Sequence, residues 1–145
     1  MIFRGRYRYN KGAYRPFITV YVSSNEEEWK KQSFLVDSGA DETFLHSRSI
    51  QLLGIDTSAL QIRDDASGIG GTSIPYIQHS IKLRLETPDG EFKIFGGPVN
   101  IFLDPHATRM PVMGRDVLDH FTVILDRKRN TILLLDEPDD YQLVR

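Results

Sequence analysis

The sequence predicts an all-β domain whose sheet closes on itself, because segments of strand character recur at short intervals along its 145 residues. Apolar and charged residues alternate over 81–86 and again over 91–95, on either side of a Pro-Asp-Gly turn, which is typical of a β-hairpin. Residues 121–125 and 131–135 flank a polar turn in the same manner. Strands joined by such short connections favour an all-β fold.

The first quarter of the chain is expected to supply two strands and an arm. Cations and tyrosines alternate over residues 1–15, which favours an exposed strand or arm, and stacking on RNA is a second interpretation of that pattern. Residues 16–22 are β-branched and aromatic and predict a strand. After a charged, water-facing connection, residues 32–36 predict another. The alternating residues of the arm are Arg4, Arg6, Arg8, Lys11 and Arg15 with Tyr7, Tyr9 and Tyr14.

The middle of the chain combines a helix with a glycine-rich hairpin. Apolar spacing over 45–54, closed by a glycine, predicts a short helix, whereas 55–62 has no clear pattern. Residues 64–77 predict a hairpin with three glycines at its centre, which suits a mobile cover. Phosphate binding is not expected there, because a Gly-x-Gly-x-x-Gly motif would need its third glycine at position 73, which is Ser73.

Towards the C-terminus, the Gly-Gly-Pro of 96–98 is expected to break a strand, and 99–103 to begin another. Residues 104–109 predict a loop, and 110–121 an apolar approach, a glycine and a short helical turn. The tail 136–145 is acidic. We therefore expect one domain over 1–145, with a core of about 17–135 between the N-terminal arm 1–15 and that tail.

Composition excludes several classes of function. The net charge of -2 and the pI near 6.1 give no basic field, so neither nucleic-acid nor membrane partners are expected. The absence of cysteine excludes disulfides and a cysteine nucleophile, and agrees with a cytoplasmic location. No metal or other cofactor is expected, because the four histidines, His46, His79, His106 and His120, have no metal-ligand spacing.

One aspartate stands out where an apolar segment meets a turn of small residues. Asp37 follows Phe34, Leu35 and Val36 and precedes Ser38-Gly39-Ala40, where the backbone can turn sharply. Such residues also form ordinary strand-to-turn junctions. A single carboxylate cannot be acid and base in one step, but two facing carboxylates share a proton and can. A homodimer with Asp37 at its two-fold axis would supply both.

Three segments, in order, resemble the retropepsins, the aspartic proteases of retroviral type. The turn that begins at Asp37 resembles the catalytic Asp-Thr/Ser-Gly-Ala-Asp motif. Residues 67–72, Ser-Gly-Ile-Gly-Gly-Thr, resemble the tip of the flap, the hairpin that covers the substrate. Residues 112–118 resemble the apolar-apolar-Gly-Arg-Asp segment before the last helix. The resemblance covers about 17–135 and implies a closed acid-protease barrel with one short C-terminal helix, working as a homodimer.

The resemblance also implies roles for individual residues. Asp37, Ser38 and Gly39 would form the catalytic turn, with Ser38 linking the two copies across the axis. A peptide or protein substrate would contact the second half of the turn and the flap, and a glycine and an arginine of the third segment would support the turn. The substrate-binding residues are Ala40, Asp41, Gly68, Ile69, Gly70 and Gly71, and the supporting residues are Gly114 and Arg115, the latter paired with Asp41.

The implied activity is that of an aspartic endopeptidase. One Asp37 carboxylate would activate a water for attack on a peptide bond while its protonated copy protonates the carbonyl oxygen. The alternative is a catalytically idle module that binds peptides or dimerises. Neither terminus matches the viral pattern, and the initial Met1 without adjoining polyprotein sequence fits a free-standing cellular member.

Overall fold

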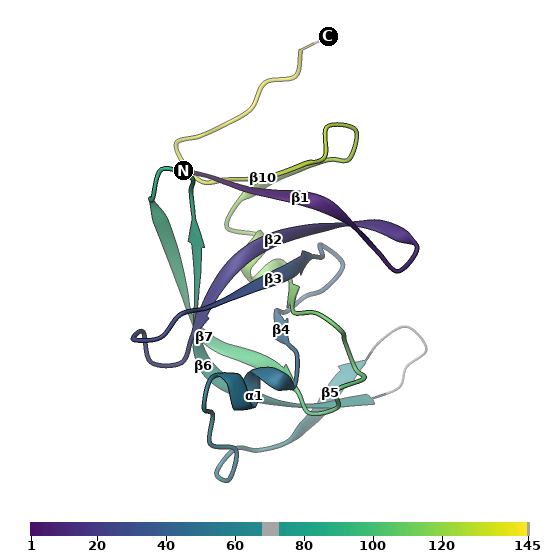
Figure 1. Cartoon of the computed structure of the whole chain (residues 1–145), viewed down its shortest axis with the longest axis vertical. Coiled ribbons are helices and arrows are strands. Elements are labelled where there is room, and N and C mark those ends of the chain that lie inside the picture. The colour runs from purple at the N-terminus through teal and green to yellow at the C-terminus, as the bar shows by residue number, and fades with distance from the viewer. Residues whose placement is uncertain (68–72, 145) are drawn as a thin grey trace.

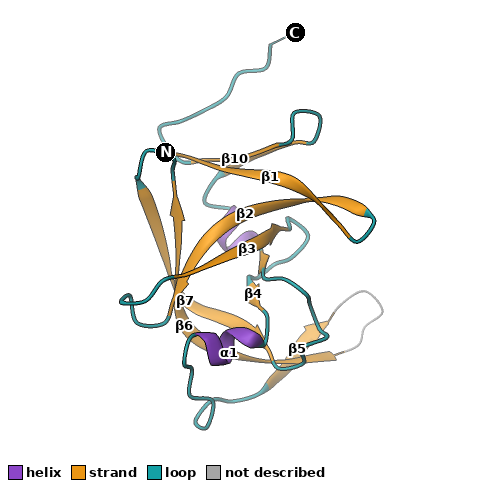
Figure 2. Ribbon diagram, viewed as in Figure 1, coloured by secondary structure: helices purple, strands orange, loops and turns teal. Residues whose placement is uncertain are grey.

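The computed structural model describes residues 1–67 and 73–144, and these residues form a mostly β structure (Figure 1, Figure 2). Two short helices accompany ten strands in this part of the chain. The strands are β1 (Ile2–Asn10), β2 (Ala13–Ser23), β3 (Lys30–Val36), β4 (Phe44–Leu45), β5 (Arg63–Ser67), β6 (Ser73–Glu86), β7 (Phe92–Phe102), β8 (Val112–Met113), β9 (Thr122–Asp126) and β10 (Thr131–Leu135), and the helices are α1 (Arg48–Leu52) and α2 (Arg115–Leu118).

The strands form one sheet in the order β5-β6-β7-β4-β8-β3-β2-β1-β10-β9, and β6 pairs with β2 as well as with β7. That second pairing joins Tyr21 of β2 to Arg84 of β6, so the sheet bends back on itself (Figure 2). The bend encloses apolar side chains from strands that are distant in sequence, among them Phe34, Ile81 and Met113, each with at most 1% of its surface exposed. Burial of these side chains stabilises the curved sheet.

The short strand β8 organises the region that follows β3. It pairs in parallel with β3, through Leu35 with Val112 and Val36 with Met113. It pairs antiparallel with β4, through Phe44 with Val112. Strands β3 and β4 are therefore held apart by β8, and the turn that joins them in sequence has to pass over the end of β8.

Both predicted hairpins of the middle region are present. Strand β5 pairs with β6, and β6 pairs with β7 from Tyr76 to Glu86. The tip of the β5–β6 hairpin, 68–72, lies outside the described residues. The expected interruption at 96–98 was wrong, because β7 continues through Gly96 and Gly97 and Pro98 pairs with Ser80. Strand β4 pairs with β7 at Asn100 and Ile101, beyond Pro98. At Pro98, strand β7 therefore has an edge that pairs with no other strand of the described residues, and a residue that lacks an N–H is tolerated there.

The N-terminal arm is a strand within the sheet. Strand β1 pairs with β2 through Arg6 to Asn10 and with β10 through Ile2 to Gly5, and Phe3 is fully buried. Phe3 thus belongs to the hydrophobic core, although it lies in the N-terminal segment that precedes the expected domain core of about 17–135. The reason is long-range pairing with β10, which turns one side of an alternating strand towards the core.

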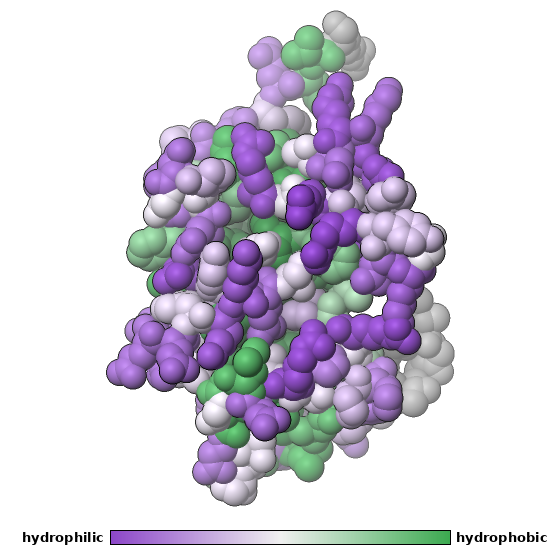
Figure 3. Space-filling view, viewed as in Figure 1, coloured by the Kyte–Doolittle hydropathy of each residue, from purple (hydrophilic) through white to green (hydrophobic). Residues whose placement is uncertain are grey.

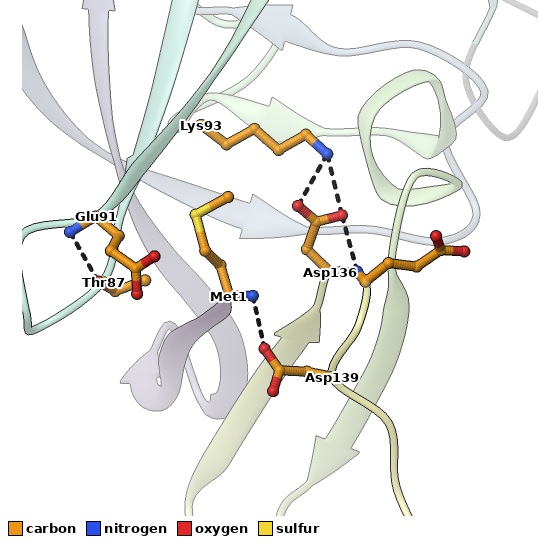
Figure 4. A network of polar contacts seen from close by, with 7 residues as sticks. Met1, Thr87, Glu91, Lys93, Asp136 and Asp139 are labelled. Atoms are coloured by element: carbon orange, nitrogen blue, oxygen red, sulfur yellow. Dashed lines mark hydrogen bonds and ion pairs between the residues drawn. The ribbon is translucent and has the colours of Figure 1, made fainter.

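The first residues of the acidic tail lie against β1 and β7 (Figure 4). The Asp136 carboxylate accepts two bonds of 3.0 Å from Lys93 Nζ, and its backbone N–H donates to Met1 O at 2.9 Å. The amino group of Met1 contacts Asp139 Oδ2 at 2.6 Å. Beyond these contacts Leu143 and Val144 are exposed. Among the described residues no helix has the length and apolar character needed to span a bilayer.

Candidate active site

Asp37 lies where β3 leaves the sheet. Its backbone N–H donates to Met113 O at 3.1 Å, and Ala40 N–H closes the turn by donating to Asp37 O at 3.2 Å. The Asp37 side chain is half-buried. Backbone bonds on both sides of the residue therefore fix where its carboxylate points, and the position is set by the pairing of β3 with β8.

Gly39 allows the turn to close onto the carboxylate. Its N–H donates to Asp37 Oδ1 at 2.9 Å. A Cβ at position 39 would lie 3.1 Å from the same oxygen, tighter than ordinary contacts. Any side chain here would crowd the carboxylate, which explains why the smallest residue occupies the position.

Hydrogen bonds between a buried threonine and an aspartate hold the end of the Asp37 turn. Thr43 is fully buried, and its hydroxyl donates to Asp116 Oδ1 at 2.6 Å while its N–H donates to Asp116 Oδ2 at 3.0 Å. The same hydroxyl accepts the N–H of Gly114 at 3.1 Å, and Asp116 Oδ1 also accepts the N–H of Val117 at 2.9 Å. One carboxylate thus ties the end of the turn to the start of α2.

Gly114 permits close approach between these segments. A Cβ on it would lie 2.4 Å from Glu42 O and 2.9 Å from Ala40 O, both backbone atoms that cannot move independently. In this close contact the N–H of Arg115 donates to Ala40 O at 2.8 Å, and that of Asp116 donates to Asp41 O at 3.1 Å. The segment 112–118 therefore hydrogen-bonds to the backbone of the turn that begins at Asp37.

The structure brings together Asp41 and Arg115, which are 74 positions apart, in an ion pair. The hydrogen bond from Arg115 to Asp41 raises the pKa of the guanidinium above its ordinary value. Both side chains are largely exposed, with 80% and 52% of their side-chain surfaces accessible. An exposed pair of this kind contributes little to stability, so the backbone bonds beside it, rather than the charges, hold the turn in place.

The sequence matches the family model described as "Retroviral aspartyl protease" over residues 12–126. The chain belongs to the retroviral aspartyl protease family. The matched range contains the Asp37 turn, the glycine-rich hairpin and the Gly114–Arg115 segment, which are the three segments that suggested the resemblance. No curated protein matches the chain in sequence.

Two solved structures illustrate what this retropepsin-like aspartic protease domain is similar to. A retropepsin-like aspartic protease from Rickettsia conorii superposes with a TM-score of 0.60 at 21% identity, over 92% of this chain and 91% of the other. This likeness supports the fold. The EIAV protease in complex with the inhibitor HBY-793 gives a TM-score of 0.44 at 18% identity, over 77% of this chain and 91% of the other.

Next to the Asp37 turn lies an open depression of about 400 Å³. Glu42 at its rim accepts a bond of 2.5 Å from Asn100 Nδ2, and the nearly buried Asn100 accepts one of 2.8 Å from Gln78. Tyr76 donates to Asp65, and this bond raises the pKa of Tyr76 to about 12. The depression is lined by Gly39, Ala40, Asp41, Glu42, Phe44, Asp65 and Tyr76.

The remaining expected site residues divide into two groups. Ser38 is exposed beside Asp37, and Ala40 and Asp41 line the depression. Gly68, Ile69, Gly70 and Gly71, the expected substrate contacts of the flap, lie outside the described residues. In residues 1–67 and 73–144 no three His, Asp or Glu side chains gather as metal ligands would.

Sequence reasoning missed Thr43, Asp116 and Asn100. Thr43 lies six residues beyond Asp37 and reads as a strand residue, and Asp116 reads as part of a helical turn. The only sequence signal was indirect: Thr43 leads into the apolar pair Phe44-Leu45, and a hydroxyl that becomes buried needs hydrogen-bond partners. The contact between Thr43 and Asp116 depends on β8 lying between β3 and β4.

Proposed function

We propose that this chain is an aspartic endopeptidase that hydrolyses peptide bonds of extended polypeptides. The observation that carries the proposal is the Asp37 carboxylate at the end of β3, in a chain of the retroviral aspartyl protease family. The backbone N–H of Asp37 donates to Met113 O, and its carboxylate accepts the N–H of Gly39. This turn holds one carboxylate per chain. The chemistry needs two, one ionised and one protonated.

We propose a homodimer in which two copies of Asp37 face one another. The ionised carboxylate removes a proton from a water held between the pair, and the oxygen of that water attacks the peptide carbonyl carbon. The protonated carboxylate donates its proton to the carbonyl oxygen as the tetrahedral centre forms. Collapse of that centre releases the amine and the acid and needs no covalent intermediate. The exposed position of Ser38 supports its proposed contact with the partner turn.

The closed barrel expected of the family is part of the same proposal, and it is supported by the pairing of β6 with both β7 and β2. The substrate would lie along the turn, with Ala40 and Asp41 on one side of it and the glycine-rich hairpin on the other. Its backbone would be bound in extended form. The depression beside Gly39 and Glu42 would take one of its side chains.

The direct test is cleavage of an unstructured peptide library between about pH 4 and 7 by the wild-type protein and by Asp37→Asn. We expect cleavage, fastest at mildly acidic pH, and its loss in Asp37→Asn. The variant should fold normally, because an amide oxygen can still accept the N–H of Gly39. Asp89→Asn, an exposed aspartate in the β6–β7 turn, is the matched control and should cleave normally.

Each outcome of this test decides between two functions. Cleavage that survives in Asp37→Asn would exclude the aspartic mechanism. Peptide binding without cleavage by the wild type would identify an idle peptide-binding module instead. Specific activity should also fall on dilution, because a dissociated subunit holds half a site. Activity independent of protein concentration, in a protein shown to be monomeric by sedimentation, would exclude the shared site.

A further inference from the structure

One face of the sheet formed by β1, β2 and β3 carries five cations. In β1 the arginines at positions 4, 6 and 8 alternate with side chains that turn towards the other face, and all three are exposed. The pairing of β1 with β2 places Arg15 opposite Arg8, and Lys31 of β3 lies opposite Tyr21 on the same side. We call this set the basic face: Arg4, Arg6, Arg8, Arg15 and Lys31.

The charges of the basic face are not neutralised within the described part of the chain. The ion pairs found there involve Lys30, Lys82, Arg84, Lys93, Arg115, Arg129 and the amino group of Met1. Two arginines of the basic face have neutral partners instead. Arg8 donates to the Ser33 hydroxyl and lies 4.6 Å from the centre of the Phe17 ring, and Arg15 donates to Asn10 O at 3.4 Å. These contacts orient the guanidinium groups and leave their charge uncompensated.

The arrangement is unfavourable for the isolated protein. Arg8 and Arg15 are directly opposite one another in an antiparallel pair, where like charges destabilise the sheet. Alternate residues of a strand are about 7 Å apart, so Arg4, Arg6 and Arg8 form a row of like charges about 14 Å long. An external anion that spans the row would relieve this repulsion.

The surface between these cations is hollowed. Three shallow depressions of about 340, 300 and 410 Å³ lie across the face, and two or more cations line each of them. Glu86, which is paired with Arg84, also lines the second. The third depression extends the positive charge to Arg48 and Arg109 beyond β3. Hydrophilic side chains gather over these strands in the space-filling view (Figure 3). The net charge of -2 is therefore the sum of a basic face and a rest of the chain that is more acidic.

We propose that the basic face binds the phosphate backbone of a single-stranded nucleic acid. Four of its five cations are arginines, whose planar forks match phosphate oxygens. An extended acidic peptide is less well suited, because it gains affinity by pairing with a free strand edge, and the basic face consists of side chains on the face of the sheet rather than of a strand edge. The proposal replaces the expectation of no nucleic-acid partner, which rested on net charge alone.

The binding should be independent of base sequence. The exposed tyrosines Tyr9 and Tyr14 pair with each other edge to face at 5.4 Å. They occupy register positions adjacent to Arg8 and Arg15, so they turn to the opposite side of the hairpin and are not placed to stack on bases lying along the basic face. The contacts that remain are to the backbone, which carries no sequence information.

The test is fluorescence anisotropy of the full chain with a labelled 20-nucleotide oligo-dT and a labelled 20-nucleotide oligo-U between 50 and 300 mM salt. Five phosphate contacts predict a slope of log K against log salt of about -3.5 for a single strand, at about 0.7 per contact. In the double variant Arg6→Gln/Arg15→Gln, which keeps Arg8 on Phe17, the slope should fall to about -2.1. A duplex and a poly-glutamate of equal charge are the comparison probes.

A control variant removes the same number of charges elsewhere. Arg63→Gln/Lys82→Gln changes β5 and β6 by two positive charges and should bind as the wild type does. Thermal unfolding without ligand should show Arg6→Gln/Arg15→Gln to be at least as stable as the wild type, because a like-charge pair has been removed.

Four outcomes would overturn the proposal: no binding to either oligonucleotide at 50 mM salt, equal loss of affinity in the two double variants, tighter binding to poly-glutamate, or tighter binding to the duplex. Poly-glutamate binding would instead indicate an acidic polypeptide as the partner. The assay needs no proteolysis, so its result is separate from the test of the proposed function.

Discussion

The contact between the buried Thr43 and Asp116 should contribute strongly to stability, and Thr43→Val measures it with almost no change in shape. The substitution removes the hydroxyl that donates to Asp116 Oδ1 at 2.6 Å and that accepts the Gly114 N–H at 3.1 Å. Losing a bond to a charged group costs about 1.5–3 kcal/mol, and a buried N–H left without an acceptor costs a further 1–3 kcal/mol or so. We expect a loss of about 3 kcal/mol in the free energy of unfolding.

Urea denaturation at one fixed protein concentration is the appropriate assay, since the proposed dimer would make stability depend on concentration. The midpoint should fall while the slope stays the same, because the same surface is exposed on unfolding. Thr122→Val, at an exposed position of β9, is the control and should change stability by less than about 0.5 kcal/mol. A loss below about 1 kcal/mol for Thr43→Val would refute the bracing role of this contact.

Three further predictions concern neighbouring residues. Gly114→Ala should lower the free energy of unfolding by at least about 2 kcal/mol, because its Cβ meets backbone atoms of Glu42. In Gly96→Ala the Cβ meets only the flexible Lys82 side chain, so this control should lose much less. Equal losses of the two variants in urea denaturation would contradict the close approach at Gly114. Arg115→Met should leave the urea midpoint almost unchanged in the same assay, since its ion pair is exposed. Tyr76 should titrate near pH 12 in ultraviolet absorbance, above the ordinary value of 10.0, because its hydroxyl donates a hydrogen bond to Asp65. Its raised pKa contributes stability below about pH 10 that is lost as the pH rises through 12, and Tyr76→Phe should remove that part of the alkaline loss.

Local patterns explain which parts of the fold could be predicted. The hairpins β6–β7 and β9–β10 follow from alternation around turn residues, which is a short-range effect. The interruption expected at 96–98 failed for the opposite reason, because whether Pro98 is tolerated depends on which strands flank β7, and this is decided by the sheet. Residues 1–15 were expected to form an exposed strand or arm, and the burial of Phe3 could not be predicted because its partners in β10 lie about 130 positions away.

The sequence by itself determined the family and the identity of the candidate catalytic carboxylate, because the Asp37 turn, the glycine hairpin and the Gly114–Arg115 segment are contiguous motifs that can be read without coordinates. Only the tertiary structure decided what holds Asp37 in place. Strand β8 separates β3 from β4 and brings Thr43 against Asp116, a contact that no local pattern encodes. The structure also decided that five cations share one face, because side-chain direction follows from strand register, whereas net charge is a sum that contains no direction.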